Sequence, residues 1–199
     1  AQLLHESEEL DGPDRRLAQI IQDHSRRMNL VIENVLQLSR RRQAEPQLLD
    51  LKYWLHRFVS EYRQGLNAQQ TVHLETIGSS LQTRMDPNQL TQVLTNLVQN
   101  GLRYSGQQHG RAQVWLRLYR EEASDLPVVE VLDDGPGIAT EQLHNVFEPF
   151  FTTESKGTGL GLYLSRELCE SNQARLDYRE RPEGGSCFRI VFAHPRKLS

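Results

Sequence analysis

The chain has 199 residues, which is enough for one or two domains with a hydrophobic core of ordinary size. Its 23 basic and 26 acidic side chains give a formal net charge of -3, which excludes a large basic field and argues against nucleic acid as a partner. No apolar run is long enough to span a membrane and residues 1–10 do not resemble a signal peptide, so we expect any membrane segment upstream of this chain.

Cysteines and histidines give no sign of a disulfide framework or of a metal site. Cys169 and Cys187 are isolated in apolar surroundings, which predicts reduced, buried thiols. The seven histidines are scattered singly, without further ligand types at ligand spacing. We therefore expect no zinc site.

The N-terminal region, residues 1–46, has the pattern of a helical hairpin. Asp11–Asp14 reads Asp-Gly-Pro-Asp, which ends one helix and starts the next. The second helix carries one seam of side chains at alternating spacings of four and three: Leu17, Ile21, His24, Met28, Val31, Val35 and Leu38. Because one hairpin leaves this seam exposed, we expect two subunits to pair into a four-helix bundle, which makes the protein a homodimer. Pro46 closes this region.

Residues 47–199 have the mixed pattern of a second domain. The predicted order is a helix at 53–63, strands at 71–77 and 81–86, a helix from 87 to about 104, strands at 112–120 and 128–132, a helix from 159 to about 171, and strands at 174–180 and 186–192. Asp86 and Pro87 form a good N-cap and first-turn pair, and Asn172 is expected in the left-handed conformation at a helix end. We expect strands 112–120 and 128–132 to be neighbours. The expected fold class is α+β, with helices covering one face of a mixed sheet.

Three local patterns in this domain can be explained either by a purely structural role or by ligand binding. Asp133–Gly137 follows a buried strand and is either a simple turn or a place where backbone closely approaches a ligand. Gly157–Leu162 opens a helix, where free N–H groups and the helix dipole favour phosphate. Asn96 and Asn100 lie one turn apart on a helix, so they are either buried, hydrogen-bonded amides or a binding pair.

Taken together, four motifs in this order resemble those of sensor histidine kinases of two-component systems. The motifs are an N box at Asn96–Asn100, a first glycine box at Asp133–Gly137, an F box at Phe147–Phe151 and a second glycine box at Gly157–Leu162. With the hairpin, the resemblance covers nearly the whole chain and is greatest to the nitrogen-regulator-type class, with pilus-transcription sensors nearest. It implies a two-layer α/β sandwich of the GHKL ATPase (Bergerat) type, preceded by the dimerising hairpin. Small departures are Gly101, where the family prefers Ala, and residues 171–173, where it has glycines.

The resemblance implies ATP and Mg2+ as cofactors. It assigns Asn100 to the Mg2+ that bridges the phosphates, and Asp133 to the adenine amino group. Residues 147–156 would form a lid over the nucleotide, with Lys156 near the γ-phosphate. The ATP-binding residues carried over by position are Asn96, Asn100, Arg103, Tyr104, Asp133, Gly135, Gly137, Ile138, Phe147, Lys156, Gly157, Thr158, Gly159, Leu160, Gly161 and Leu162.

Asn96 bears on the type of reaction. Related ATPases of this fold carry at this position a Glu that acts as general base for water, and an amide cannot accept a proton at neutral pH. The resemblance therefore implies a kinase, which transfers the γ-phosphoryl group to a His and then to an Asp of a response regulator. The expected partners are that receiver domain and a second copy of the chain, in the cytoplasmic portion of an inner-membrane sensor.

The phosphoacceptor motif of the family, His-Glu-hydrophobic-Arg-Asn-Pro-Leu, has no match in the chain. His5 is followed by Glu6 but not by the Arg, Asn or Pro, and His24 lies on the apolar seam. We expect the nucleophile upstream of Ala1, so that this chain binds MgATP without phosphorylating itself. Two alternatives stay open: a GHKL-fold dimerisation module without kinase activity, and a GHKL-fold ATPase or serine kinase.

Overall fold

The computed structural model describes residues 14, 16–22, 24–25, 28, 32, 44–154 and 157–195. The described positions before residue 44 are helical. Most of the expected hairpin lies outside the described residues, so the hairpin, its pairing into a bundle and the boundary at Pro46 stay predictions. Within the described part of the chain, no helix has the length and apolarity needed to cross a membrane.

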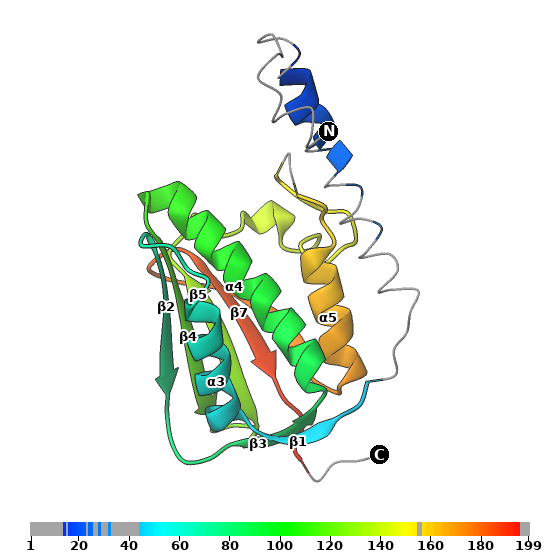
Figure 1. Ribbon diagram of the computed structural model, residues 1–199. Helices are drawn as coiled ribbons and strands as arrows, with labels where there is room; N and C mark the ends of the chain where they lie inside the picture. The colour runs from blue at the N-terminus through cyan, green and yellow to red at the C-terminus, as the bar shows by residue number, and fades with distance from the viewer. Residues whose placement is uncertain are drawn as a thin grey trace.

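Two sheets form the frame of the domain (Figure 1). The small one pairs β1 (Gln47–Asp50) antiparallel with β3 (Gln82–Met85). The large one has the order β2 (Gln70–Thr76), β4 (Ala112–Arg120), β5 (Pro127–Asp133), β7 (Ser186–Val191) and β6 (Arg175–Glu180). The β2–β4 pair is parallel and the other pairs are antiparallel. The predicted mixed sheet and the predicted pairing of β4 with β5 are confirmed.

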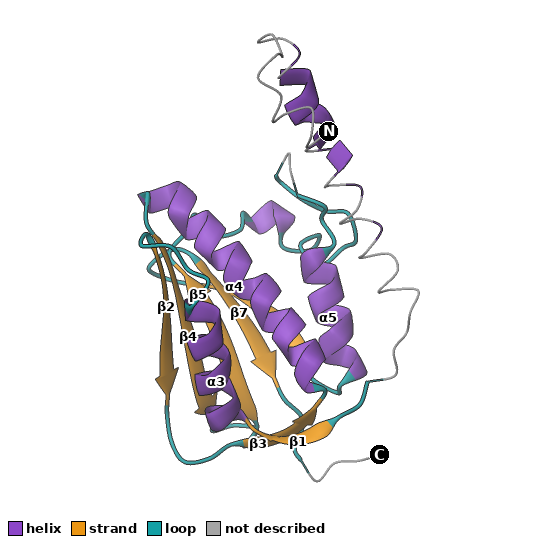
Figure 2. Cartoon of the chain, in the orientation of Figure 1, coloured by secondary structure: helices purple, strands orange, loops and turns teal. Residues whose placement is uncertain are grey.

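Three helices cover one face of the large sheet, as Figure 2 shows: α3 (Leu51–Arg63), α4 (Pro87–His109) and α5 (Gly161–Ser171). A short 3-10 helix, η1, covers Thr140–Gln142. Alternate residues of β4 explain the layer, because Val114, Leu116 and Leu118 are fully buried beneath the helices while their neighbours are partly exposed. The predicted α+β class with helices on one face is confirmed.

The two cysteines are reduced, as the sequence predicts. Cys169 lies in α5 and Cys187 in β7, and both are free and buried. Burial raises the pKa of the Cys169 thiol to about 12 and that of the Cys187 thiol to about 11. Neither thiol is therefore ionised near neutral pH.

Helix ends differ from the predictions at four places. α3 starts at Leu51 rather than at residue 53, with Asp50 as its N-cap. α4 continues to His109 and stops at Gly110, whose φ of 71° and N–H bond to the Gly106 carbonyl end it. α5 starts at Gly161, because Gly159 has a φ of 68°, outside the helical range. The prediction for Asn172 was wrong: its φ is -105°, and the left-handed residue is Gln173, with a φ of 60°.

A row of charges crosses the face of the large sheet that the helices leave uncovered. The strand register places one charged residue of each strand side by side with alternating sign, in the order Glu75, Arg117, Glu130, Arg189 and Asp177. Arg117 Nε lies 2.9 Å from Glu75 Oε2, and Arg117 Nη1 lies 3.8 Å from Glu130 Oε2. The row therefore joins β2, β4 and β5 through side chains as well as through backbone.

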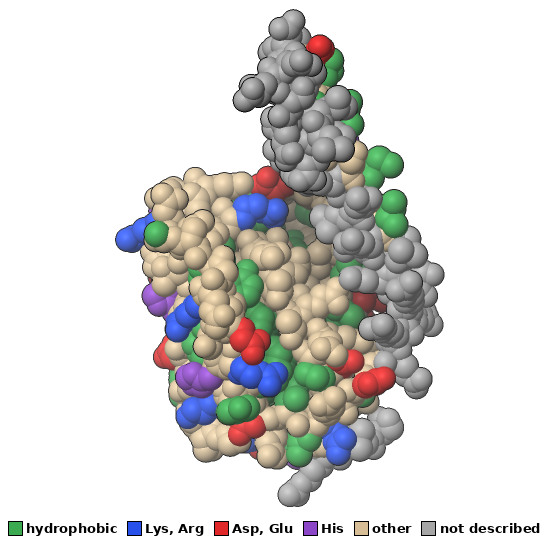
Figure 3. All heavy atoms as spheres, in the orientation of Figure 1, with side chains coloured by type: hydrophobic (Ala, Val, Ile, Leu, Met, Phe, Trp, Pro, Cys, Tyr) green, Lys and Arg blue, Asp and Glu red, His purple; other side chains and the backbone are tan. Residues whose placement is uncertain are grey.

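Around the helical layer, charges are mixed rather than gathered. In Figure 3, Lys and Arg side chains alternate with Asp and Glu side chains over the described surface of this face. The exposed part of α3 contributes an Arg57–Glu61 ion pair at 3.7 Å. Such exposed pairs contribute little to stability.

Candidate functional site

The candidate site lies where α4, the end of β5 and the start of α5 meet, at the upper end of the domain in Figure 1. A Cβ atom added to Gly101 of α4 would lie 3.4 Å from the Asp133 Cβ and 2.7 Å from a methyl group of Val114. The residue that follows the N box on α4 is therefore packed against the first residue of the first glycine box. The alanine that related sequences prefer at position 101 has no room here unless Val114 moves.

Asp133 is a buried carboxylate at the last position of β5, with only 3% of its surface exposed. Its Oδ1 accepts hydrogen bonds from the N–H groups of Gly135, at 2.9 Å, and Ser186, at 3.2 Å. Burial raises the pKa of this carboxyl, and the two N–H groups oppose part of the rise. Neither of these bonds uses Oδ2, which is turned toward Gly101.

The turn after Asp133 requires its glycines. At Gly135, a Cβ would lie 3.0 Å from both Tyr104 and the Asp133 carboxylate. Gly137 has a φ of 75°, and its Cβ would lie 3.1 Å from the carbonyl oxygen of Gly185. The turn is therefore packed tightly between α4 and the loop before β7.

The two asparagines of α4 have different partners. The Asn100 Oδ1 accepts a hydrogen bond from Arg103 at 3.0 Å, and the Arg103 guanidinium lies over the Tyr104 ring at 4.9 Å. Asn96 donates from Nδ2 to the hydroxyl of Ser165 in α5, at 2.9 Å. Asn100 is thus bound within α4, whereas Asn96 joins α4 to α5.

The start of α5 leaves backbone donors without a side-chain cap. Leu160 is the N-cap residue and supplies no side-chain hydrogen bond. The first N–H groups of a helix have no partner within it, so they are available to an anion. At Gly161, a Cβ would lie 2.4 Å from the Asn96 Oδ1, which brings this end of α5 against the N box. A hollow of about 310 Å³ opens beside it, lined among others by Asn96, Gly161 and Ser165.

The F box is anchored at one end and exposed at the other. The Phe147 ring packs edge-on against Phe188 of β7, with centroids 6.4 Å apart, and the Arg166 guanidinium lies 5.3 Å from its centroid. Phe150 is 63% exposed and has a φ of 66°. Lys156, the predicted lysine of the lid, lies outside the described residues.

These elements are those of a known family. Residues 85–196, more than half of the chain, match the family of histidine kinase-, DNA gyrase B- and HSP90-like ATPases. The chain belongs to this ATPase family. Within it, the chain is 75% identical over all 199 residues to the sensor protein kinase PilS of Pseudomonas aeruginosa, of which it spans 38%. It is 34% identical over 198 residues to the sensory histidine kinase/phosphatase NtrB of Rhodobacter capsulatus, covering 96% of this chain and 55% of NtrB.

Solved structures agree with the fold of this ATPase family. The catalytic domain of the histidine kinase ThkA superposes with a TM-score of 0.61 at 24% identity, and the match covers 74% of this chain and 95% of that domain. The predicted sensor-kinase family, nitrogen-regulator-type class and GHKL fold are confirmed. The chain covers only part of its curated relatives, which are named sensor kinases.

Some residues around the ATPase-family boxes were not predicted from the sequence. Ser186 and Arg181 both bind Asp133, the latter by a 2.6 Å hydrogen bond from Nη1 to the Asp133 carbonyl oxygen. They come from the β6–β7 hairpin, and no local motif marks them. Ser165 lies one turn after Gly161 on α5, and that spacing could have indicated a side chain facing α4.

Metal binding in this site would use few protein ligands. Across residues 44–154 and 157–195, no group of three His, Cys, Asp or Glu side chains could hold a metal ion. Asn100 offers an amide oxygen, a ligand type that suits hard cations such as Mg2+. A Mg2+ ion would therefore depend on phosphate oxygens and water for most of its ligands.

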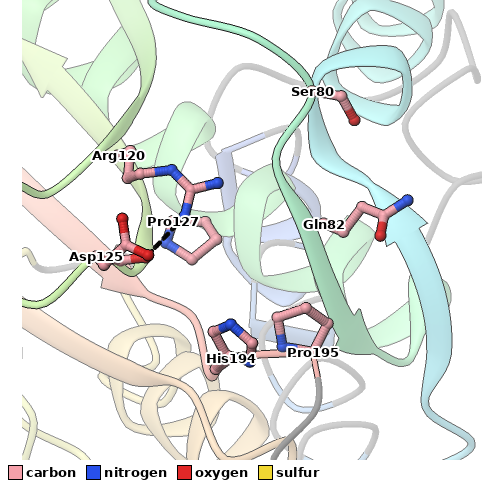
Figure 4. Close-up of a pocket in the computed structure, with 7 residues that line it drawn as sticks. All are labelled: Ser80, Gln82, Arg120, Asp125, Pro127, His194 and Pro195. Atoms are coloured by element: carbon pink, nitrogen blue, oxygen red, sulfur yellow. Dashed lines mark hydrogen bonds and ion pairs between the residues drawn. The ribbon is translucent and has the colours of Figure 1, made fainter.

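A second hollow lies at the opposite end of the domain. It measures about 360 Å³ and lies beside the small sheet and the chain after β7 (Figure 4). Its Arg120 forms an ion pair with the largely exposed Asp125 at 3.2 Å. Its lining residues are Ser80, Gln82, Arg120, Asp125, Pro127, His194 and Pro195, so it contains no residue of the four boxes.

Proposed function

We propose that this chain is the ATP-binding catalytic region of a two-component sensor histidine kinase. The observation that carries the proposal is the meeting of three features at one end of the domain: the Asn100 helix, the buried Asp133 carboxylate and the uncapped start of α5. A nucleotide needs an acceptor for its base and donors for its phosphates within one site. Membership of the ATPase family and 75% identity to a sensor kinase support the same function.

The base would bind at Asp133 and the first glycine turn. Asp133 Oδ2 would accept the hydrogen of the adenine amino group, while Oδ1 stays bound to the Gly135 and Ser186 N–H groups. Gly135 and Gly137 let the backbone approach the base, and Ile138 would pack beside it. Because the acceptor is buried, this hydrogen bond would be formed away from water and would discriminate strongly between bases.

The phosphates would bind between α4 and the start of α5. The backbone donors at Gly157, Gly159 and Gly161 would face them, with Thr158, Leu160 and Leu162 completing this segment. Arg103 and Tyr104 would line the phosphate and ribose side. Phe147 would be the anchored end of a lid that runs to Lys156 and covers the nucleotide.

Mg2+ would be held by Asn100 together with the phosphates. When bound, Mg2+ neutralises charge on the phosphates and helps to orient them. Arg103 now donates to the Asn100 oxygen at 3.0 Å, so metal binding would require this guanidinium to turn toward the phosphates. The same movement would bring a second positive charge to them.

Phosphoryl transfer rather than hydrolysis fits the residue at position 96. The Asn96 amide cannot remove a proton from water, and its Nδ2 is already bound to Ser165. ATP would therefore persist until a better nucleophile arrives, and the site would act by positioning and charge neutralisation. In the whole protein we expect that nucleophile to be a His upstream of Ala1.

The whole protein would transfer the phosphoryl group from that His to an Asp of a response regulator, and would thereby control transcription. Identity to PilS and NtrB supports this role, and the name of PilS supports regulation of pili. We propose a homodimer with a membrane-anchored region upstream and this chain on the cytoplasmic side. The regulator would bind as a receiver domain.

Nucleotide titration of two variants tests the site. Asp133→Asn should abolish affinity for a non-hydrolysable ATP analogue, because the amide places a donor where the base also has one. Asn100→Ala should retain affinity without metal and chiefly lose the gain that Mg2+ gives. Equal affinities in both variants and wild type would contradict the site assignment.

Labelling with γ-labelled MgATP tests the reaction. A longer chain that includes the expected upstream His should acquire acid-labile, alkali-stable phosphate, and the present chain should acquire none. Label on the present chain would disprove the upstream nucleophile. Nucleotide binding without label on either chain would favour the nucleotide-binding dimerisation module, and rapid phosphate release would favour an ATPase.

A further inference from the structure

A buried polar junction joins α4 to α5 at the end of both helices far from the glycine boxes. Asp86, the N-cap of α4, is 8% exposed, and its Oδ1 accepts hydrogen bonds from the N–H groups of Asn88, at 2.8 Å, and Gln89, at 3.3 Å. Its own N–H group donates to the Oδ1 of Asn172 at 2.8 Å. Asn172 is the C-cap residue of α5 and is 4% exposed.

Asn172 closes this junction into a ring. Its Nδ2 donates to the side-chain oxygen of Gln89 at 2.6 Å and to the Leu168 carbonyl oxygen at 2.8 Å. Through these bonds the Asn172 side chain binds the start of α4 at two points and the last turn of α5 at the Leu168 carbonyl oxygen, with a longer contact of 3.4 Å from Nδ2 to the Ser171 hydroxyl. Only an uncharged amide supplies both the acceptor and the two donor bonds in this geometry.

The chain that enters the domain binds the same aspartate. The N–H group of Glu45 donates to the Asp86 Oδ2 at 3.1 Å, just before β1 pairs with β3. The Glu45 side chain is exposed, so its contribution to the junction is this backbone bond. Asp86 thus contacts the entering chain and the start of α4 through its carboxylate, and the end of α5 through its own N–H group, which is bound to Asn172.

The opposite end of α5 is the start at Gly161, about 16 Å away along a rigid helix. Apart from the helix packing, that start is fixed to α4 by the Asn96–Ser165 hydrogen bond. A shift of α5 at the junction would therefore move the backbone donors at its start relative to Asn100. Displacements well below 1 Å matter for donors that must meet phosphate oxygens.

We propose that Asn172 is a positioning residue for the phosphate end of the nucleotide site, and that the Asp86–Asn172 junction couples the entering chain at Glu45 to that site through α5. This inference rests on the proposed function, because it assigns the phosphates to the start of α5. It predicts a change in phosphate binding from a residue that touches no nucleotide.

The first test compares a ligand with phosphates and one without. For Asn172→Ala, affinity for the non-hydrolysable ATP analogue AMP-PNP should fall about tenfold, the order expected from the loss of buried hydrogen bonds. Affinity for adenosine, which uses Asp133, should stay within about twofold. Gln173→Asn, at the adjacent exposed left-handed position, is the matched control and should change neither.

The outcomes of this test separate the positioning role of Asn172 from the proposed function of the chain. Equal loss of both affinities in Asn172→Ala, or loss of neither, would overturn the positioning role while leaving the proposed function intact. Failure of wild type to bind AMP-PNP would overturn the proposed function itself. If Asn172→Ala does not fold, Gln89→Ala removes the bonds that the Gln89 side chain accepts from Asn172 and from the Ser171 hydroxyl, and it should give the same split of affinities at smaller size.

The second test removes the bond from the entering chain. Glu45→Pro deletes the N–H group that reaches Asp86, and Glu45→Ala is the control that keeps it. The proline variant should weaken AMP-PNP binding about threefold relative to the alanine variant, and should have no further effect when combined with Asn172→Ala. Additive effects in the double variant would show that Glu45 and Asn172 act separately and would overturn the coupling.

Discussion

A buried carboxylate such as that of Asp133 lowers the stability of the free protein and prepares the site for a ligand. Its ionised form loses hydration, and the N–H groups of Gly135 and Ser186 compensate only in part, so its pKa is raised. A ligand that donates a hydrogen to Oδ2 would complete the compensation. The same residue is therefore expected to control both base recognition and the pH dependence of stability.

Thermal unfolding of Asp133→Asn in the absence of nucleotide should show this pH dependence. A pKa that is higher in the folded than in the unfolded protein stabilises the fold below the unfolded pKa, and this stabilisation is lost as pH rises through the folded pKa. Only wild type has this term. The melting temperature of wild type relative to the variant should therefore fall as pH rises above about 4, the pKa of an aspartate in an unfolded chain, and a constant difference would contradict the raised pKa.

At the scale of elements, the lid and α5 depend on glycine at one contact point. Gly159 has a φ of 68°, and a Cβ there would lie 2.4 Å from the carbonyl carbon of Phe150. Phe150 itself has a positive φ, which is strained for a residue of its size. The F box and the segment before α5 therefore fit together only when residue 159 has no side chain.

Two alanine substitutions separate the effect of this contact from that of the backbone conformation. Gly184→Ala has a φ of 87° and no atom within 4 Å of the added Cβ, so it should cost about 1 kcal/mol and leave AMP-PNP affinity unchanged. Gly159→Ala should in addition displace Phe150 and weaken AMP-PNP binding at least about tenfold. Chemical denaturation and nucleotide titration measure the two effects, and equal nucleotide affinity in both variants would rule out the contact.

Local signals account for what could be predicted at this scale. Strand alternation, the Asp86 cap and the four boxes involve residues close in sequence, and they identified the elements and the order of the layers. The end of α4 at Gly110 was marked by a local signal, a glycine, that the prediction did not use, whereas the start of α5 at Gly161 follows a tertiary contact of Gly159 with Phe150. Asn172 was misread for the same reason, since a local signal for a left-handed turn could not reveal its bonds to Asp86 and Gln89.

The residues of the candidate site also divide into those that local motifs predict and those that only the folded structure brings together. The boxes supplied the residues that would touch a nucleotide, because their spacing is a property of the family. Ser186 and Arg181 reach Asp133 only after the β6–β7 hairpin pairs with β5. Such supporting residues depend on strand pairing over more than 40 positions of sequence, as the separations of 53 and 48 residues show.

At the scale of the whole molecule, the charge row of the uncovered sheet face contains one residue from each of the five strands. Its most buried member is Arg189, whose side chain is 1% exposed and which binds Glu121 and the Tyr119 hydroxyl. Glu130, next to it in the row, accepts a hydrogen bond from the same hydroxyl at 2.8 Å. Removal of Arg189 would therefore take the ion-pair partner from Glu121 and a hydrogen-bond donor from the Tyr119 hydroxyl, whereas Glu130 would keep Arg117.

Arg189→Met should lower the free energy of unfolding by about 2 kcal/mol, less than for a fully buried pair because Glu121 remains partly hydrated. The matched control is Arg175→Met on the neighbouring strand, where the arginine is 69% exposed and pairs with Asp177, and it should cost less than about 1 kcal/mol. Urea denaturation measures both values. Similar losses of unfolding free energy in the two variants would show that the charge row does not contribute to stability.

The small sheet has a consequence for how the domain connects to the rest of a protein. The chain enters through β1, which pairs with β3, and it leaves past β3, where the Thr83 hydroxyl binds the Ala193 carbonyl oxygen at 3.1 Å. Both connections lie at the end opposite the glycine turns (Figure 1). Residues 44–195 thus have the geometry of an exchangeable unit, because fusion to another domain at either end would leave the glycine turns unobstructed.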